Sequence, residues 1–271
     1  MPVLDRHAQA RHREPPAPLR ARGRGRRGDG GRLTGAWLPA GGLVLALDTG
    51  SERCSVALLD PETREVLARA DPVIGRGHAE RLMPLVEEVL AEAGAGWNAV
   101  GRIGVGIGPG SFTGIRVALA AAHGLRLSLG CPLVGISSLE ALAEPHRGTA
   151  SPVLAVQDAK RGEVYAALFA PGGGMLAGPE AIAPEALADF VRPASEWPLV
   201  LAGSGAAIAQ DILGERETRI ASSDGAPDIA AVARLAAMAV PGGEVRALYL
   251  RGADARPSGA PSLVVSAATS P

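Results

Sequence analysis

The sequence of 271 residues contains little cysteine and no long hydrophobic run, and both shortages narrow the class of protein. Its apolar stretches are strand-length or alanine-rich, and none reaches the roughly 20 residues that a membrane-spanning helix needs, so we expect no membrane anchor. The two cysteines, Cys54 and Cys131, lie far apart in the chain and have no metal-ligand spacing around them. We therefore interpret them as buried thiols without chemistry of their own, in a cytoplasmic protein.

Lysine is nearly absent, since Lys160 is the only one, and positive charge is concentrated at the N-terminus as arginine. Residues 1–42 hold nine arginines against three acidic residues, a net charge of +6. Because the whole sequence has a formal net charge of −1, the remainder carries −7. This balance argues against a uniformly basic nucleic-acid-binding surface on the rest of the chain.

Composition divides the chain into four parts. Residues 1–41 are rich in Arg, Pro and Gly and have almost no periodic apolar pattern, which predicts a disordered extension. A mis-assigned start codon, a genuine flexible tail and an Arg-rich targeting peptide all remain open as explanations of that extension. We expect an N-terminal subdomain over 42–148, a C-terminal subdomain over 149–257 and a loose tail over 258–271.

Hydrophobic periodicity predicts an alternation of strands and helices in both halves. In the first half we predict strands at 43–47, 54–59, 65–70, 103–107 and 132–136, and helices at 78–93 and 113–129. In the second half we predict strands at 153–157, 163–169 and 199–202, a turn at 158–162, and helices at 184–191 and 228–240. A hairpin that opens each half and is followed by helices indicates an α/β fold of two subdomains, each a mixed sheet with helices. That is the plan of the actin-like (ASKHA) superfold of sugar kinases and Hsp70.

A glycine-rich loop joins a predicted strand to a predicted helix within residues 104–116. Glycines allow close backbone approach and a helix N-terminus offers unpaired N–H groups, so this architecture suits an anion. No Lys-Ser/Thr pair follows the glycines, which excludes a Walker A loop, and the spacing is not the dinucleotide fingerprint. A tight structural turn is the alternative. The candidate phosphate-facing or turn residues are Asp48, Thr49, Gly50, Ser51, Gly108, Gly110 and Ser111.

Asp48 and three serines are the first candidates for chemistry at these loops. An acidic residue at a strand end can hold nucleotide-bound magnesium through water, but Asp48 followed by Thr-Gly-Ser also makes a good Asx turn, and we favour the turn. No Gly-x-Ser-x-Gly elbow surrounds Ser111, Ser137 or Ser138, so a hydrolase is not indicated. We predict that all three serines cap helices.

The helix predicted at 78–93 is strongly amphipathic, because its leucines and valines recur at spacings of three and four. This apolar stripe has two explanations: it packs on the chain's own sheet, or it contributes to a four-helix interface with a partner together with the helix at 113–129. The candidate interface residues are His78, Glu80, Arg81, Leu82, Leu85, Glu88 and Val89.

Six segments together resemble the bacterial TsaB (YeaZ) family. They are Ala46–Thr49, Gly77–Leu82, Gly106–Arg116, Ser137–Leu142, Asp158–Tyr165 and Tyr249–Asp254. The resemblance covers about residues 43–257 and is densest up to residue 142. One departure is Ala247, which stands where the family often has proline.

The resemblance implies a paralogue of TsaD, the catalytic subunit that transfers a threonylcarbamoyl group to the adenosine 3′ to the anticodon. TsaD carries a metal-binding His-x-x-x-His pair, and the matching positions here are Ser138 and Leu142. Two histidines four apart on a helix can hold one ion, whereas a leucine cannot. The resemblance therefore implies no catalytic residues, no metal and no cofactor of the chain's own, with ATP and Mg left open at a partner subunit or at the interface of a complex.

We accordingly predict a noncatalytic dimerisation or scaffold subunit that partners TsaD and the ATPase TsaE in tRNA threonylcarbamoyladenosine formation. It would contact tRNA through the complex and no membrane, and a homodimer of the free protein remains open. The alternative is an independent nucleotide-dependent phosphotransferase or ATPase of the actin-like superfold. A third hypothesis, direct tRNA binding by residues 1–41, predicts strongly salt-sensitive affinity.

Overall fold

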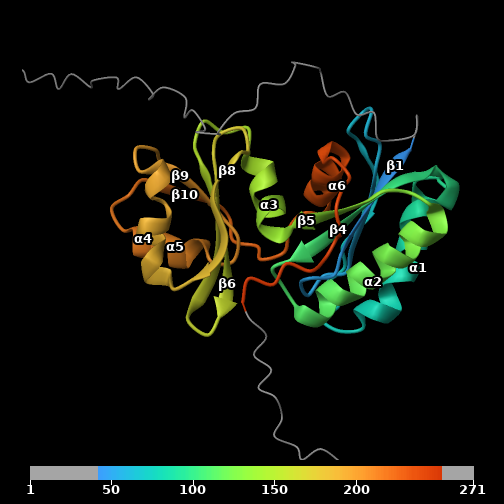
Figure 1. Ribbon diagram of the computed structural model, residues 1–271, viewed down its shortest axis with the longest axis horizontal. Helices are drawn as coiled ribbons and strands as arrows, with labels where there is room; N and C mark the ends of the chain where they lie inside the picture. Colours follow the sequence, from blue (N-terminus) through green and yellow to red (C-terminus); the bar gives the residue numbers. More distant parts are fainter. Residues whose placement is uncertain (1–41, 252–271) are drawn as a thin grey trace, which may run out of the picture.

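Two five-stranded mixed sheets organise residues 42–251, the part of the chain that the computed structural model describes (Figure 1). The first sheet has the order β3-β2-β1-β4-β5, in which β1 pairs antiparallel with β2 and parallel with β4. Its strands are β1 (Leu43–Asp48), β2 (Ser55–Leu59), β3 (Val66–Ala70), β4 (Val100–Gly108) and β5 (Leu133–Ser137). β1 and β2 read as continuous apolar runs because helices cover both faces of the sheet at these strands.

The second sheet has the order β10-β9-β6-β7-β8 and starts, like the first, from an antiparallel hairpin. Its strands are β6 (Val153–Lys160), β7 (Glu163–Phe169), β8 (Met175–Ile182), β9 (Leu199–Ala202) and β10 (Thr218–Ser222). On one face of it pack the short helices α4 (Leu187–Phe190) and α5 (Ala206–Leu213). Its other face packs against α3 (Ser138–Ala143), which in Figure 1 stands between the two sheets. The predicted class, two subdomains each with a mixed sheet and helices, is confirmed.

Two long helices and one short helix cover the first sheet. α1 (His78–Glu92) and α2 (Phe112–Leu129) lie on the outer face, close to the ranges predicted from periodicity. α6 (Ile229–Met238) covers the opposite face, where it packs on β1, β2 and β4. In Figure 1, α6 lies beside α3 between the sheets. We call the first sheet with α1, α2 and α6 the first lobe, and the second sheet with α4 and α5 the second lobe. The second-half range 149–257 therefore does not coincide with one packed unit, because α6 completes the core of the first lobe.

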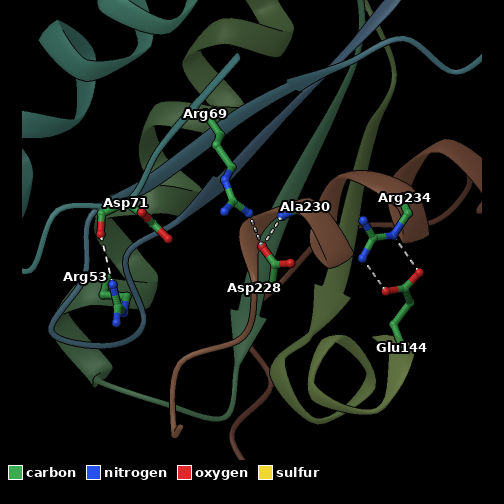
Figure 2. Close-up of polar contacts among 7 residues, drawn as sticks. All are labelled: Arg53, Arg69, Asp71, Glu144, Asp228, Ala230 and Arg234. Carbon is green, nitrogen blue, oxygen red and sulfur yellow. Dashed lines mark hydrogen bonds and ion pairs between the residues drawn. The ribbon is translucent and has the colours of Figure 1, made fainter. Parts of the chain in front are cut away.

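Polar contacts fix α6 at its N-terminus and along its side (Figure 2). The Asp228 carboxylate accepts a hydrogen bond from the Ala230 N–H at 3.0 Å and pairs with Arg69 of β3 at 3.2 Å. Further along the helix, Arg234 makes a two-pronged pair with Glu144, at 2.8 and 2.7 Å. Glu144 begins a 3₁₀ turn (Glu144–His146) that follows α3. These pairs tie α6 to both an edge strand of its sheet and the connection between the lobes.

Three second-half elements were not predicted: β8, α5 and β10. Further differences are small. β6 continues to Lys160, which pairs with Glu163, so the turn contains only Arg161 and Gly162, at φ 56° and 77°. The helix predicted at 184–191 is a 3₁₀ turn (Pro184–Ala186) followed by α4. Two other 3₁₀ turns lie at Trp97–Ala99 and Arg192–Ala194. The predicted extension at 1–41 and tail at 258–271 lie outside the described residues.

Within residues 42–251, no helix combines enough length with enough hydrophobicity to cross a membrane.

Candidate functional site

The Asp48–Ser51 turn and the glycine loop, which are about sixty residues apart in sequence, interlock by backbone contacts. The Ser111 N–H donates to the Gly50 carbonyl at 2.7 Å, and the Thr49 hydroxyl donates to the Gly114 carbonyl at 2.7 Å. A Cβ added at Gly110 would lie 2.5 Å from the Gly50 oxygen, which is closer than real Cβ contacts come. These glycines therefore serve close approach between two chain segments, which supports the structural interpretation of the loop.

Asp48 lies at the centre of this contact and is almost fully buried, with 3% of its surface exposed. Its Oδ1 accepts a hydrogen bond from the Gly50 N–H at 2.8 Å, which is the Asx turn expected from the sequence. Its other oxygen lies against Gly106 of β4, where an added Cβ would be only 1.8 Å away. Burial raises the pKa of Asp48 from 3.8 to about 6, while the Gly50 hydrogen bond and the nearby His78 act in the opposite direction. A carboxyl group that is buried and already hydrogen-bonded to the backbone stabilises the turn, and it has little room to bind a metal ion through water.

The raised pKa of Asp48 predicts a stability effect that depends on pH. Because the pKa is higher in the folded state, the contribution is full below the unfolded value of 3.8 and is lost as the pH rises through about 6. A shift of this size corresponds to ~3 kcal/mol of unfolding free energy. We expect Asp48→Asn, which keeps the Gly50 hydrogen bond, to match the wild type near pH 4 and to exceed it by ~3 kcal/mol above about pH 7 in urea unfolding. A difference between the two proteins that does not change with pH would contradict this assignment.

An open cleft of about 500 Å³ separates the two lobes next to this turn. Of the candidate phosphate-facing residues, Gly50, Ser51, Gly110 and Ser111 line it. Asp48, Thr49 and Gly108 are instead buried beneath it. The opposite wall comes from β6, β7 and the loop before α6, and includes Gln157, Asp158, Lys160, Tyr165 and Asp224. The structure thus brings part of the predicted set to one surface, together with second-lobe residues that were not predicted as site residues.

The three serines have different surroundings. Ser111 is the N-cap of α2, and its hydroxyl accepts the Gly114 N–H at 3.3 Å, as predicted. Ser137 occupies the N-cap position of α3, but its side chain makes no capping hydrogen bond and its buried hydroxyl has no partner. Ser138 is the first residue of α3 and is buried. The prediction that all three serines cap helices is therefore wrong for Ser137 and Ser138, since the β5–α3 connection turns both into the interior.

The predicted interface stripe on α1 divides into an inner and an outer set. Leu82, Leu85 and Val89 are all buried in the core beneath α1, together with Leu45 and Val56 of the sheet. They cannot contact a partner, so their assignment to an interface is wrong and the stripe packs on the chain's own sheet. The inward position follows from the apolar face itself, which is removed from water where α1 packs on β2 and β3.

The polar members of the predicted interface do lie outward on α1. Glu80 is exposed, and Arg81 makes a two-pronged ion pair with Glu88, at 2.6 and 2.7 Å. The hydrogen bonds from Arg81 lower the pKa of Glu88. His78 begins the helix, and its Nε2 is buried without a hydrogen-bond partner. The outer face of α1 is therefore partly self-paired.

The positions that correspond to the metal-binding pair of TsaD lie on α3, and Ser138 and Leu142 are both buried there. Among residues 42–251, no three His, Cys, Asp or Glu side chains gather closely enough to hold a metal ion. Cys54 and Cys131 are both free and buried, and burial raises the pKa of each thiol, to about 11 for Cys54. Neither thiol is activated as a nucleophile.

Two segments that are distinctive in the second half of the sequence meet in space. Arg251, at the end of the described chain, pairs with Glu163 of β7 and stacks 6.0 Å from the centre of the Tyr165 ring. On the other side, the Leu248 N–H donates to the Ile107 carbonyl at 2.8 Å, so this segment bridges both lobes. Both segments carry the resemblance in the sequence, but a single sequence holds no signal that brings residues 88 positions apart together.

Comparison with known proteins gives the affiliation of this fold. The family model for TsaD, tRNA N6-adenosine threonylcarbamoyltransferase, matches residues 72–255, more than half of the chain. The tRNA threonylcarbamoyladenosine biosynthesis protein TsaB of Escherichia coli K12 is 38% identical over 124 residues, which cover 45% of this chain and 52% of that protein. The chain thus spans about half the length of this relative.

Two further similarities cover a larger share of this chain. TsaB of Bacillus subtilis 168 is 32% identical over 185 residues, which cover 64% of this chain and 77% of that protein. The solved structure of YeaZ from Pseudomonas aeruginosa is 31% identical, superposes with a TM-score of 0.62, and is covered to 90% by 72% of this chain. The chain therefore belongs to the TsaD family, in its TsaB (YeaZ) branch.

Proposed function

We propose that this chain is a noncatalytic subunit of the assembly that forms threonylcarbamoyladenosine in tRNA, in which it partners a TsaD-like catalytic subunit. The names of its TsaB relatives support the pathway. The observation that carries the noncatalytic role is Leu142, a buried leucine on α3 at a position where the resemblance to TsaD places a metal-binding histidine. A hydrocarbon side chain supplies no ligand atom, so this lobe interface cannot repeat the metal chemistry of TsaD.

The outer face of α2 supports the partner role. Along it Ala120, Gly124 and Leu127 are exposed, and Leu127 has 85% of its surface in contact with solvent. A Cβ added at Gly124 would meet no atom within 4 Å, so this face has open space in the single chain. Small residues at spacings of three and four let a second helix approach closely. Beside it, α1 presents Met83 and Pro84, which continue the apolar character.

The test is reconstitution of tRNA modification from TsaD, a TsaE-like ATPase and the threonylcarbamoyl-adenylate synthase, with and without this protein. We expect threonylcarbamoyladenosine to form only when both this protein and TsaD are present. We also expect Leu127→Arg to abolish the effect and to separate the two proteins on size-exclusion chromatography, because a buried unpaired charge costs several kcal/mol at a helix interface. The same substitution would also dissociate a homodimer of the free protein if two copies use this face.

The matched control is Ile212→Arg on α5, an exposed isoleucine in the other lobe, which should leave both modification and co-elution unchanged. Modification that proceeds equally well without this protein would refute the subunit role. ATP hydrolysis by the purified chain alone, sensitive to residues that line the interlobe cleft, would instead support the phosphotransferase or ATPase alternative.

A further inference from the structure

An exposed cluster of two aromatic rings and one guanidinium lies at the N-terminus of α2. The Arg116 guanidinium stacks 3.7 Å from the centre of the Phe112 ring and donates to the Tyr249 hydroxyl at 3.0 Å. The two rings are 5.3 Å apart between centres. Nevertheless Phe112 is 50% exposed and Tyr249 is 48% exposed. The rings are held in place while much of their surface remains in water, an arrangement that hydrophobic burial alone does not explain.

The cluster continues across the lobes to the tip of the β6–β7 hairpin. Arg251, two residues after Tyr249, contacts the Tyr165 ring, pairs with Glu163 and donates to the Lys160 carbonyl at 3.4 Å. In Figure 1 the described chain ends between this hairpin and α2, in the lower part of the view. These two clusters are joined by the chain from Tyr249 to Arg251, and we call them together the aromatic stripe; it consists of Phe112, Arg116, Tyr249, Arg251, Tyr165 and Lys160.

The composition of the aromatic stripe is unusual for this chain. The sequence has only two tyrosines, three phenylalanines and one lysine, and the stripe contains both tyrosines, one phenylalanine and the lysine. The stripe and the hairpin tip that continues it carry four cations, with Arg161, against the two carboxylates of Asp158 and Glu163. Residues outside the arginine-rich first 42 carry −7 in total, so this surface is locally positive on an acidic body.

From this geometry we propose that the aromatic stripe binds single-stranded RNA. Unpaired bases stack on aromatic rings and on guanidinium planes, while the cations interleaved with those rings contact the phosphates. The half-exposed faces of Phe112 and Tyr249 supply the stacking surface. The Lys160 side chain is 81% exposed and pairs with Asp158 at 2.8 Å, so a phosphate would share this ammonium with the carboxylate. An acidic peptide would use the cations but would gain little from two ordered rings.

The choice of RNA over other single-stranded nucleic acid rests on the proposed function, in which the modified adenosine adjoins an anticodon loop. Phe112 and Arg116 lie two turns and one turn before Ala120 on α2, so the stripe adjoins the proposed partner face on the same helix. Direct binding by the isolated chain therefore tests the stripe separately from the subunit role.

The experiment is fluorescence anisotropy of the full chain with a labelled single-stranded RNA of about ten nucleotides. We expect Phe112→Ala and Tyr249→Ala each to weaken binding about 5- to 150-fold, the range for removal of one stacked base. Phe112→Trp should retain the wild-type affinity, whereas Phe112→Leu, which keeps the apolar character but loses the ring, should behave like Phe112→Ala. Residues 1–42 add an electrostatic contribution, but it is common to all these variants.

The matched controls are Met175→Ala on β8 and Arg192→Gln, which remove an exposed apolar side chain and an exposed cation far from the stripe. Neither control should change RNA affinity. The proposal is overturned if RNA binds the Phe112 and Tyr249 variants as tightly as the wild type, or if these variants lose a protein partner and keep RNA. Loss of RNA binding with an intact requirement for the chain in tRNA modification would support the stripe and leave the subunit role standing.

Discussion

Gly114→Ala is expected to lower the free energy of unfolding by more than about 3 kcal/mol, at or beyond the upper end for overpacking. The new Cβ would lie 1.9 Å from the carbonyl oxygen of Thr49 and 2.9 Å from its carbon. Those are backbone atoms of a fully buried residue whose hydroxyl is already bonded to the Gly114 carbonyl, so no flexible side chain can move aside. The substitution should force α2 away from the Asp48–Ser51 turn. Urea unfolding measures the resulting loss of stability.

Gly124→Ala on the same helix is the matched control for this prediction. No atom lies within 4 Å of its added Cβ, so only helix propensity changes. The control should stabilise the protein by up to about 1 kcal/mol, the difference between glycine and alanine in a helix interior. If the two substitutions changed stability alike, the close approach at Gly114 would not be what holds the two loops together.

Arg102→Met should also be destabilising, by about 1–3 kcal/mol, the cost of leaving buried hydrogen-bond acceptors without their donor. Arg102 lies on β4 with 2% of its surface exposed, and burial lowers the pKa of its guanidinium. Its Nη1 donates to three carbonyls at the C-terminal end of α6, those of Ala236, Ala237 and Ala239, at 2.7, 3.0 and 2.8 Å. Methionine keeps the apolar stem but leaves these carbonyls without their donor.

Hydrogen exchange measured by mass spectrometry would locate the effect of Arg102→Met. We expect the amides of α6 to exchange faster than those of α5 in the variant, because the lost contacts are at the α6 terminus. Arg126→Met, which removes an exposed arginine from the last turn of α2, should change stability by no more than about 0.5 kcal/mol. Uniform acceleration across both lobes would indicate a general loss of core packing and would contradict the capping role.

Elements with a clear period were predicted well from the sequence. The leucines and valines of α1 gave a helix within one residue of that observed, and the continuous apolar runs gave β1 and β9. β8 and β10 were missed because most of their residues are partly or fully exposed, so neither alternation nor a continuous apolar run marks them. α6 was found as a helix, but its alanine-rich sequence is buried at most positions and does not indicate which sheet it covers.

The candidate site was less predictable because its meaning depends on what each backbone segment touches. The glycines at 110 and 114 suit an anion loop and a close contact equally well in sequence, and only the position of Thr49 and Gly50 distinguishes the two. The apolar stripe on α1 would look the same in sequence whether it packed on the chain's own sheet or on a partner. The structure shows that it packs on the first sheet. Arg116, Tyr249 and Arg251 lie in segments that resemble the family. The sequence does not show that they share a surface, because Tyr249 and Arg251 meet Arg116 and Tyr165 only where the end of the described chain passes between the lobes.

The position of α6 has a consequence for synthesis on the ribosome. One face of the first sheet, which includes Val44, Ala46, Ala57 and Leu59, is covered by a helix that is translated about 180 residues after β1. Until α6 emerges, that face has no cover from its own lobe, and the nascent chain exposes a flat apolar surface. The core of the first lobe is therefore begun first during translation and completed only after the strands of the second sheet have been made.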